Sequence, residues 1–203
     1  MRAIKYIGTL ILGLWALSAV ATVENPVTLL QTSIANLQQD VAGHNASLAS
    51  DPNQLYAIVK QNVMPLIDIE RMAGMTLGPK WRSASQAEKN QFIDSFGLLM
   101  TRVYTSALLE VANYRITIYP MRNNNWQNQQ QLIVRGQVTS GASNQASNIA
   151  YYMERSGDTW KIYDFAVEGV SVVKNYQSQF QSFPDMAIVL SKLQQLNQQF
   201  VSS

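Results

Sequence analysis

The spacing of apolar and polar positions changes inside the stretch Thr159–Phe180. Up to Val167, residues rich in Trp, Tyr, Ile and Val alternate between two largely apolar faces, as in a strand that is covered on both sides. From Val170 onwards, apolar residues recur every three or four positions, which is the spacing of one helix face. Gly169 favours a tight turn between the two patterns, because glycine tolerates positive φ. We therefore expect a strand that leads directly into an amphipathic helix.

Helical spacing also dominates the chain before residue 111. Asn25-Pro26 and Asp51-Pro52 each combine a capping side chain with a proline suited to the first turn, and Asp68 is a further capping residue. Ser85-Gln86-Ala87-Glu88 has the spacing of a capping box. The predicted helices run from Pro26 to Gly43, from Pro52 to just before Pro65, from Asp68 to Leu77 with Gly78-Pro79 as its stop, from Ser85 to about Val111, from Ser171 to Gln181, and from about Met186 to Phe200.

Four runs of alternating residues follow one another after residue 114. They are Arg115–Tyr119, Leu132–Thr139, Asn148–Arg155 and the strand that begins at Thr159. Consecutive strands joined by direct links favour antiparallel pairing. The predicted fold is therefore a single α+β domain with N-terminal helices, a four-stranded antiparallel meander sheet and C-terminal helices.

The first 21 residues have the pattern of a secretory signal peptide. Arg2 and Lys5 precede the apolar run Ile7–Leu17, and Ala19-Val20-Ala21 is a small-residue cleavage site. A membrane anchor is the alternative, but this run is much shorter than the ~20 apolar residues that a spanning helix needs. We therefore expect residues 1–21 to be a signal peptide and 22–203 to be the functional domain.

The remaining chain is electrically balanced, since removal of Arg2 and Lys5 leaves 13 basic and 13 acidic residues. This balance argues against nucleic acid as a partner. The chain contains no cysteine, so an exported domain would be held together by its core alone, without disulfides.

Motifs for enzyme chemistry are scarce. The sequence has no phosphate-binding loop, dinucleotide fingerprint or nucleophile elbow, and its single histidine, His44, falls in a predicted loop without metal-ligand spacing. Asp164 and Glu168 could form a general acid–base pair in a pocket. In the alternative that we favour, Asp164 satisfies a backbone or arginine partner, and Glu168 lies near a helix N-terminus. We expect no enzyme activity, no cofactor and no metal.

Apolar residues facing one another are abundant on the long helix, on the last two strands and on the helix that follows them. They could simply pack together, or a concave sheet flanked by helices could leave a cavity for an apolar ligand. The candidate lining residues are Leu99, Val103, Ala107, Leu108, Val111, Ile149, Tyr151, Met153, Tyr163, Phe165, Val167, Val170 and Val173.

Three segments of the chain resemble the MlaC family of periplasmic phospholipid-binding proteins, also called the toluene-tolerance family. The order of elements agrees along essentially the whole chain after residue 21. The segments are Arg71-Met72-Ala73-Gly74, Thr76-Leu77-Gly78-Pro79-Lys80-Trp81-Arg82-Ser83-Ala84-Ser85 and Tyr163-Asp164-Phe165-Ala166-Val167-Glu168-Gly169-Val170-Ser171.

This resemblance implies an NTF2-like α+β cone that holds the acyl chains of a phospholipid between helices and sheet. It further implies a monomeric carrier in the periplasm of a Gram-negative bacterium, which maintains outer-membrane lipid asymmetry. Its implied partners are an outer-membrane lipoprotein–porin complex and an inner-membrane ABC transporter with an MCE-domain protein. The alternatives are an NTF2-like enzyme with a cavity carboxylate, and an interaction protein with a filled core.

Overall fold

The computed structural model describes residues 23–44, 48, 52–104, 107, 109–122, 125–141 and 145–199. The expected signal peptide, the cap Asp51 and the last predicted helical residue, Phe200, lie outside these residues. In the described part, no helix combines the length and the apolar character needed to cross a membrane.

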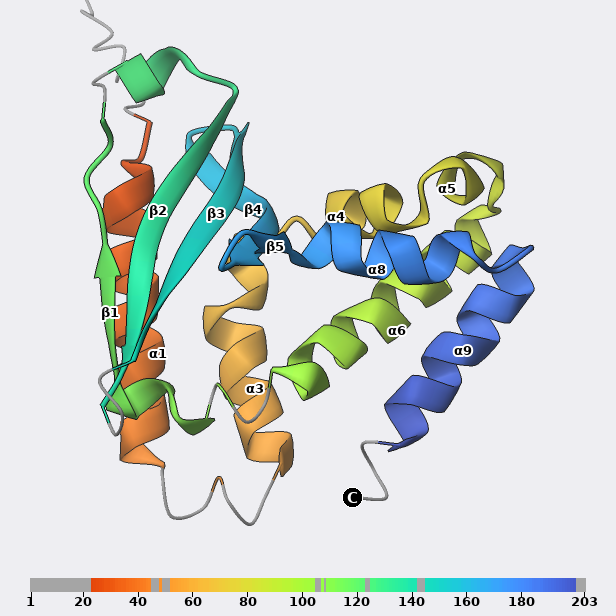
Figure 1. Cartoon of the computed structure of the whole chain (residues 1–203), viewed down its shortest axis with the longest axis horizontal. Helices are drawn as coiled ribbons and strands as arrows, with labels where there is room; N and C mark the ends of the chain where they lie inside the picture. The colour runs from red at the N-terminus through yellow and green to blue at the C-terminus, as the bar shows by residue number, and fades with distance from the viewer. Residues whose placement is uncertain are drawn as a thin grey trace, which may run out of the picture.

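The described elements follow the order of helices, sheet and helices that the sequence predicts, so the α+β class is confirmed (Figure 1). In chain order they are α1 (Pro26–Gly43), α3 (Pro52–Asn62), the 3-10 turn η1 (Met64–Leu66), α4 (Ile69–Leu77), α5 (Pro79–Ser83), α6 (Gln86–Val103), η2 (Val111–Asn113), β1 (Tyr114–Ile118), η3 (Asn125–Asn128), β2 (Gln131–Ser140), β3 (Ala146–Ser156), β4 (Thr159–Val167), β5 (Val170–Ser171), α8 (Val172–Gln181) and α9 (Met186–Gln199).

Helix starts agree closely with the capping signals. The Asn25 side chain accepts hydrogen bonds from the first turn of α1, and that of Asp68 accepts one from the first turn of α4. Ser85 and Glu88 form both halves of the predicted capping box at the start of α6. Each side chain satisfies backbone N–H groups that have no partner within the helix, which fixes the first residue of the helix locally.

One helix is shorter than predicted, and one short helix was not predicted. Helix α6 ends at Val103 and not near Val111, because the backbone of Tyr104 (φ −96°, ψ 5°) leaves helical geometry. There the Tyr104 ring packs edge-on against Phe165 of β4, with ring centroids 5.4 Å apart. Gly78, at a positive φ of 57°, ends α4 as predicted, but Pro79 then opens the additional short helix α5.

The described strands form one antiparallel sheet in the order β1-β2-β3-β4-β5. The prediction of four strands omitted β5, a two-residue strand that pairs with the end of β4. Between β4 and β5 lies a tight turn at Glu168 and Gly169, whose φ angles are 49° and 80°. The turn predicted at Gly169 is thus confirmed, and it reverses the chain before α8 begins.

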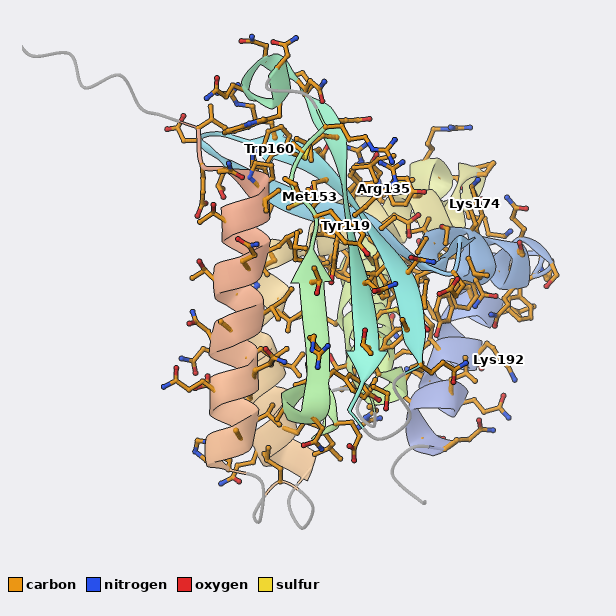
Figure 2. The ribbon with its side chains drawn as sticks, turned by 60° about the vertical axis from the view of Figure 1, so that its left-hand side comes forward. Tyr119, Arg135, Met153, Trp160, Lys174 and Lys192 are labelled. Carbon is orange, nitrogen blue, oxygen red and sulfur yellow. The ribbon has the colours of Figure 1, made fainter. Side chains whose placement is uncertain are left out.

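Buried side chains form three clusters. One lies among α4, α6, α8 and α9, a second between α1 and the sheet, and a third among α1, α3 and η2. Figure 1 shows the corresponding arrangement, with α1 along the sheet and the helices α4, α6, α8 and α9 gathered beside them. In Figure 2, Met153 and Trp160 lie together in the second cluster, near the start of α1. The space between the clusters contains the candidate site.

Candidate functional site

A cavity of about 540 Å³ lies between the inner face of the sheet and helices α1, α3, α4 and α6. Its volume falls in the range of small-molecule binding pockets. None of the described residues that line it carries a charged side chain. The lining consists of Leu30, Ser33, Ile34, Leu37, Val59, Asn62, Val63, Met64, Leu66, Ile67, Ile69, Met72, Met100, Thr101, Tyr104, Ala107, Val111, Tyr114, Ile116, Val138, Ser140, Gln145, Ser147, Ile149, Tyr151, Ile162, Phe165 and Val167.

The sheet wall of the cavity depends on an irregularity in β4. Tyr152 of β3 pairs with Asp164, but the next residue, Met153, pairs with Ile162, so Tyr163 is an extra residue in the ladder. An extra residue shifts the alternation of side chains between the two faces. Ile162 and Phe165 therefore both line the cavity, although three positions separate them.

One part of the helix wall comes from α6 and η1. Met100 and Thr101 of α6 line the cavity together with Tyr104, which follows the helix, and the Met64 side chain passes close to Gly97 of α6. The hydroxyl of Thr101 donates a hydrogen bond to the Gly97 carbonyl over 3.0 Å. A satisfied hydroxyl leaves mainly its methyl group to meet a ligand, so this wall presents thioethers and apolar carbon.

Uncharged polar groups gather at one end of the sheet. Tyr114 of β1 pairs directly with Ser140 of β2, and Ser147 lies beside them on β3. Together with Gln145, these residues line one part of the cavity. Hydroxyl and amide groups can both donate and accept hydrogen bonds. This polar end, defined as Tyr114, Ser140, Gln145 and Ser147, could therefore hold the polar portion of an amphipathic ligand.

Two tyrosines of the lining, Tyr104 and Tyr151, have raised pKa values. Burial raises the pKa of Tyr151 from 10.0 to about 12. Burial also raises the pKa of Tyr104, and the negative charge of Asp164 adds to this effect. Both phenols therefore remain protonated at neutral pH, and the cavity stays uncharged.

The two carboxylates proposed as a catalytic pair have structural partners instead. Asp164 is only 6% exposed, and its two oxygens accept hydrogen bonds from the Ser171 hydroxyl (2.5 Å) and from the backbone N–H of Val173 (3.0 Å) at the start of α8. Glu168 accepts a hydrogen bond from the backbone N–H of Asn148 on β3. Neither carboxylate is among the described residues that line the cavity, so the favoured interpretation holds for Asp164.

No metal centre is evident in the described part of the chain, where no three His, Asp or Glu side chains come together in a group that could hold an ion. His44 lies at the end of α1, with Nδ1 2.8 Å from the Asp40 carbonyl oxygen. The arrangement as a whole suits binding of an apolar or amphipathic molecule better than bond-making chemistry.

Comparison with known proteins identifies the family. The family model described as MlaC protein matches residues 31–198. The chain belongs to the MlaC family.

Named relatives agree with this membership. An intermembrane phospholipid transport system binding protein MlaC of Haemophilus influenzae is 27% identical over 157 residues, covering 74% of this chain and 71% of the relative. The toluene tolerance protein ttg2D of Pseudomonas putida is 23% identical over 158 residues, covering 77% and 72%.

A crystal structure also shares the fold. It is that of the phospholipid-binding protein from Ralstonia solanacearum, in complex with a phospholipid. The two structures superpose with a TM-score of 0.81, covering 88% of this chain and 99% of the other, at 21% sequence identity. This likeness shows that the MlaC-family chain described here has the same overall architecture.

The structure brings together only part of the lining that the sequence predicts. Leu108 lies outside the described residues. Six of the other twelve predicted residues line the cavity, and they are Ala107, Val111, Ile149, Tyr151, Phe165 and Val167.

The other six lie elsewhere, for identifiable reasons. Leu99, Val103 and Val173 pack into the cluster of α4, α6, α8 and α9, and Met153 is fully buried in the cluster beneath α1. Tyr163 belongs to the outer face because of the irregularity in β4, and the Arg71 guanidinium lies 4.0 Å from its ring centroid. Val170 is 64% exposed, in the short strand β5 that precedes α8.

The prediction missed the contribution of the N-terminal helices. Leu30, Ile34 and Leu37 of α1 and Val59 of α3 line the cavity. Their helical spacing identifies an inward face, but the same spacing describes a face that packs against a solid core. Periodicity alone therefore could not separate cavity wall from filled core.

Proposed function

We propose that this protein binds phospholipid in the cavity and carries it between membranes, as a binding protein and not as an enzyme. The observation that carries the proposal is a cavity of about 540 Å³ whose described lining is overwhelmingly apolar and contains no charged side chain. Such a lining replaces the hydrocarbon surroundings of an acyl chain without requiring directional contacts.

In this proposal the acyl chains contact the inner face of the sheet and the facing helices. The sequence-predicted residues in these contacts are Ala107, Val111, Ile149, Tyr151, Phe165 and Val167. The head group lies at the polar end defined above, where Tyr114 and Ser147 offer hydrogen bonds. Because apolar burial does not distinguish head groups, we expect weak selectivity among them.

The energetic need for such a carrier follows from the hydrophobic effect. A diacyl lipid has roughly 30 methylene groups, each worth ~0.8 kcal/mol when removed from water, so free transit costs on the order of 20 kcal/mol. A cavity that shields the chains lowers this barrier. The sequence contains no nucleotide-binding motif, so in our proposal any energy for directional transport comes from a partner.

Export and partners extend the proposal. Residues 1–21 act as a signal peptide, and residues 22–203 work as a monomer in the periplasm of a Gram-negative bacterium. The protein exchanges phospholipid with an outer-membrane lipoprotein–porin complex and with an inner-membrane ABC transporter that carries an MCE-domain protein, and so maintains lipid asymmetry. The name of the Haemophilus influenzae relative, which refers to an intermembrane phospholipid transport system, supports this assignment.

The test is to express the full chain with its own leader and purify it from the periplasmic fraction without detergent. Native mass spectrometry and lipid extraction would then measure bound phospholipid. We expect a near-stoichiometric complex with phospholipid, in which the mass of the protein corresponds to a chain cleaved after Ala21. Recovery of lipid-free protein that also fails to take up phospholipid from vesicles would refute the proposal.

A further inference from the structure

Three methionine side chains line the cavity on its helix side. Met64 comes from η1, Met72 from α4 and Met100 from α6. Met64 and Met100 are partly exposed, whereas Met72 is only 2% exposed and belongs to the cluster of α4, α6, α8 and α9. The opposite wall, formed by the sheet, presents branched and aromatic side chains. The thioethers are thus concentrated on the helix side of the cavity, where they would contact a bound ligand.

Thioethers are the only sulfur groups of the chain, which contains eight methionines and no cysteine. Thioether sulfur is polarizable, and exposed methionines are readily oxidised to the sulfoxide. A fourth methionine, Met75, provides an internal comparison. It is 37% exposed on the outer side of α4, beside Arg71 and Trp81, and it does not line the cavity.

We infer that Met64 and Met100 form an oxidation site inside the cavity, and that their conversion to sulfoxides by a peroxide blocks loading of the apolar ligand. The inference rests on the proposed lipid binding. In the reaction the sulfur attacks one peroxide oxygen and the O–O bond breaks. One oxygen stays on the sulfur as the sulfoxide, while the other leaves as water after taking up a proton. The sulfur loses two electrons, and the peroxide gains them.

The sulfoxide penalises the loaded state more than the empty one. In the empty cavity, water can hydrogen-bond to the new S=O group. Acyl chains would exclude that water and offer no donor, so the polar oxygen would be buried without a partner. The fold itself depends little on these two side chains, because both are only partly buried and neither is among the buried residues of the cluster of α4, α6, α8 and α9. We therefore expect loss of binding without unfolding.

Occupancy should in turn control the modification. Acyl chains packed against Met64 and Met100 would keep peroxide away from the sulfur atoms, whereas Met75 faces solvent in either state. Met72 should react more slowly than all three, because it is almost completely buried. The relative oxidation rates of the four methionines therefore report whether the cavity is empty.

The experiment treats lipid-free and phospholipid-loaded protein with hydrogen peroxide and maps the sulfoxides by peptide mass spectrometry. We expect Met64 and Met100 to oxidise in the lipid-free protein and to be protected in the loaded protein, with Met75 oxidised in both. Uptake of phospholipid from vesicles of neutral lipid should fall roughly tenfold after oxidation, because the loaded protein would bury a polar oxygen that has no hydrogen-bond donor. Methionine sulfoxide reductase should restore uptake.

Variants separate the site from general damage. Met64→Leu with Met100→Leu conserves volume but removes both sulfur atoms, so the uptake of this variant after peroxide should equal its own uptake before peroxide. The matched control Met75→Leu should bind normally before treatment and lose uptake as the unmodified chain does.

Two failures are distinguishable. Untreated protein that takes up no phospholipid would overturn the proposed function. Normal uptake after complete oxidation of Met64 and Met100, or equal oxidation of both in loaded and lipid-free protein, would overturn the inference while leaving the function intact.

Discussion

A carboxylate introduced on the sheet wall tests whether the cavity holds acyl chains. Ile149 lies on β3, a central strand, where it pairs with Val167 of β4, and both residues line the cavity. In Ile149→Glu the new side chain should lie in water while the cavity is empty. It should meet hydrocarbon once lipid enters, so the substitution should weaken binding far more than it weakens folding.

The expected size of the effect follows from protonation. A glutamate with an ordinary pKa of about 4.3 can avoid burying its charge by taking up a proton, which at pH 7 costs about 3.7 kcal/mol. Burial of the neutral carboxyl adds about 1–3 kcal/mol. The affinity for phospholipid should therefore fall roughly 10³- to 10⁵-fold at pH 7. At pH 5 protonation costs only about 1 kcal/mol, so about a hundredfold of the affinity should return.

The assay measures phospholipid uptake from vesicles at pH 7 and pH 5, with circular dichroism and urea unfolding as checks on the fold. Ile133→Glu is the matched control, because Ile133 lies on the neighbouring strand β2 and is absent from the cavity lining. It should carry a similar charge on the opposite face of the sheet without affecting uptake. The wild type should change little between the two pH values, because the described lining holds no charged group.

Three results would refute this reasoning. Undiminished binding by Ile149→Glu would mean that the lipid does not contact the sheet wall at this point. Equal loss at both pH values would point to a structural defect instead of a buried charge. Equal loss in Ile133→Glu would show that a carboxylate anywhere on the sheet is disruptive.

Three further predictions concern stability. Gly97→Ala should raise the free energy of unfolding by about 0.5–1 kcal/mol in urea titrations, because alanine favours the helix and its Cβ would lie 3.7 Å from Met64 and 3.9 Å from Ile69; a decrease would show that the space is overpacked. Above pH 10, stability should fall as pH rises toward 12, because Tyr151 keeps its proton in the fold and loses it when unfolded; the loss is at most ~3 kcal/mol from this group, and Tyr151→Phe should make the urea midpoint less sensitive to pH over that range, whereas an unchanged pH profile would contradict the burial argument. Asp164→Asn should destabilise the fold by about 1–3 kcal/mol in thermal or urea unfolding, because a buried acceptor of two hydrogen bonds is altered; unchanged stability would show that the two contacts contribute little.

Local signals in the sequence were sufficient for most of the fold. Caps at Asn25, Asp68 and Ser85 act through hydrogen bonds to the adjacent turn, so a few neighbouring residues determine where each helix begins. The end of α6 is different, because Tyr104 leaves the helix where its ring packs on Phe165 of β4, far away in sequence. No local pattern reports such a contact. The two-residue strand β5 is likewise too short to produce an alternating pattern.

The lining residues of the site were harder to predict, because they depend on the pairing of β3 with β4. Strict alternation placed Tyr163 and Phe165 on the same face of β4, with Ile162 on the other. The extra residue in the ladder between β3 and β4 reverses this relation, so Ile162 joins Phe165 in the cavity and Tyr163 contacts Arg71. A sequence of alternating apolar residues contains no sign of such a bulge, because both faces of this strand are covered.

The cavity can exist because stability comes from the packing around it. The rings of Phe92, Phe96, Tyr176 and Phe180 pack together between α6 and α8 in stacked and edge-on pairs, with centroids 5.3 to 6.5 Å apart. Polar contacts fasten this group of helices to the sheet, notably an ion pair between Arg71 of α4 and Glu154 of β3 and the bonds from Asp164 to the start of α8. With both sides fixed, the apolar walls cannot collapse onto each other as they would in an ordinary core. A ligand that fills this apolar space gives its walls the packing contacts that they lack in the empty protein. The walls of the cavity, and not the most densely packed core, therefore identify the site.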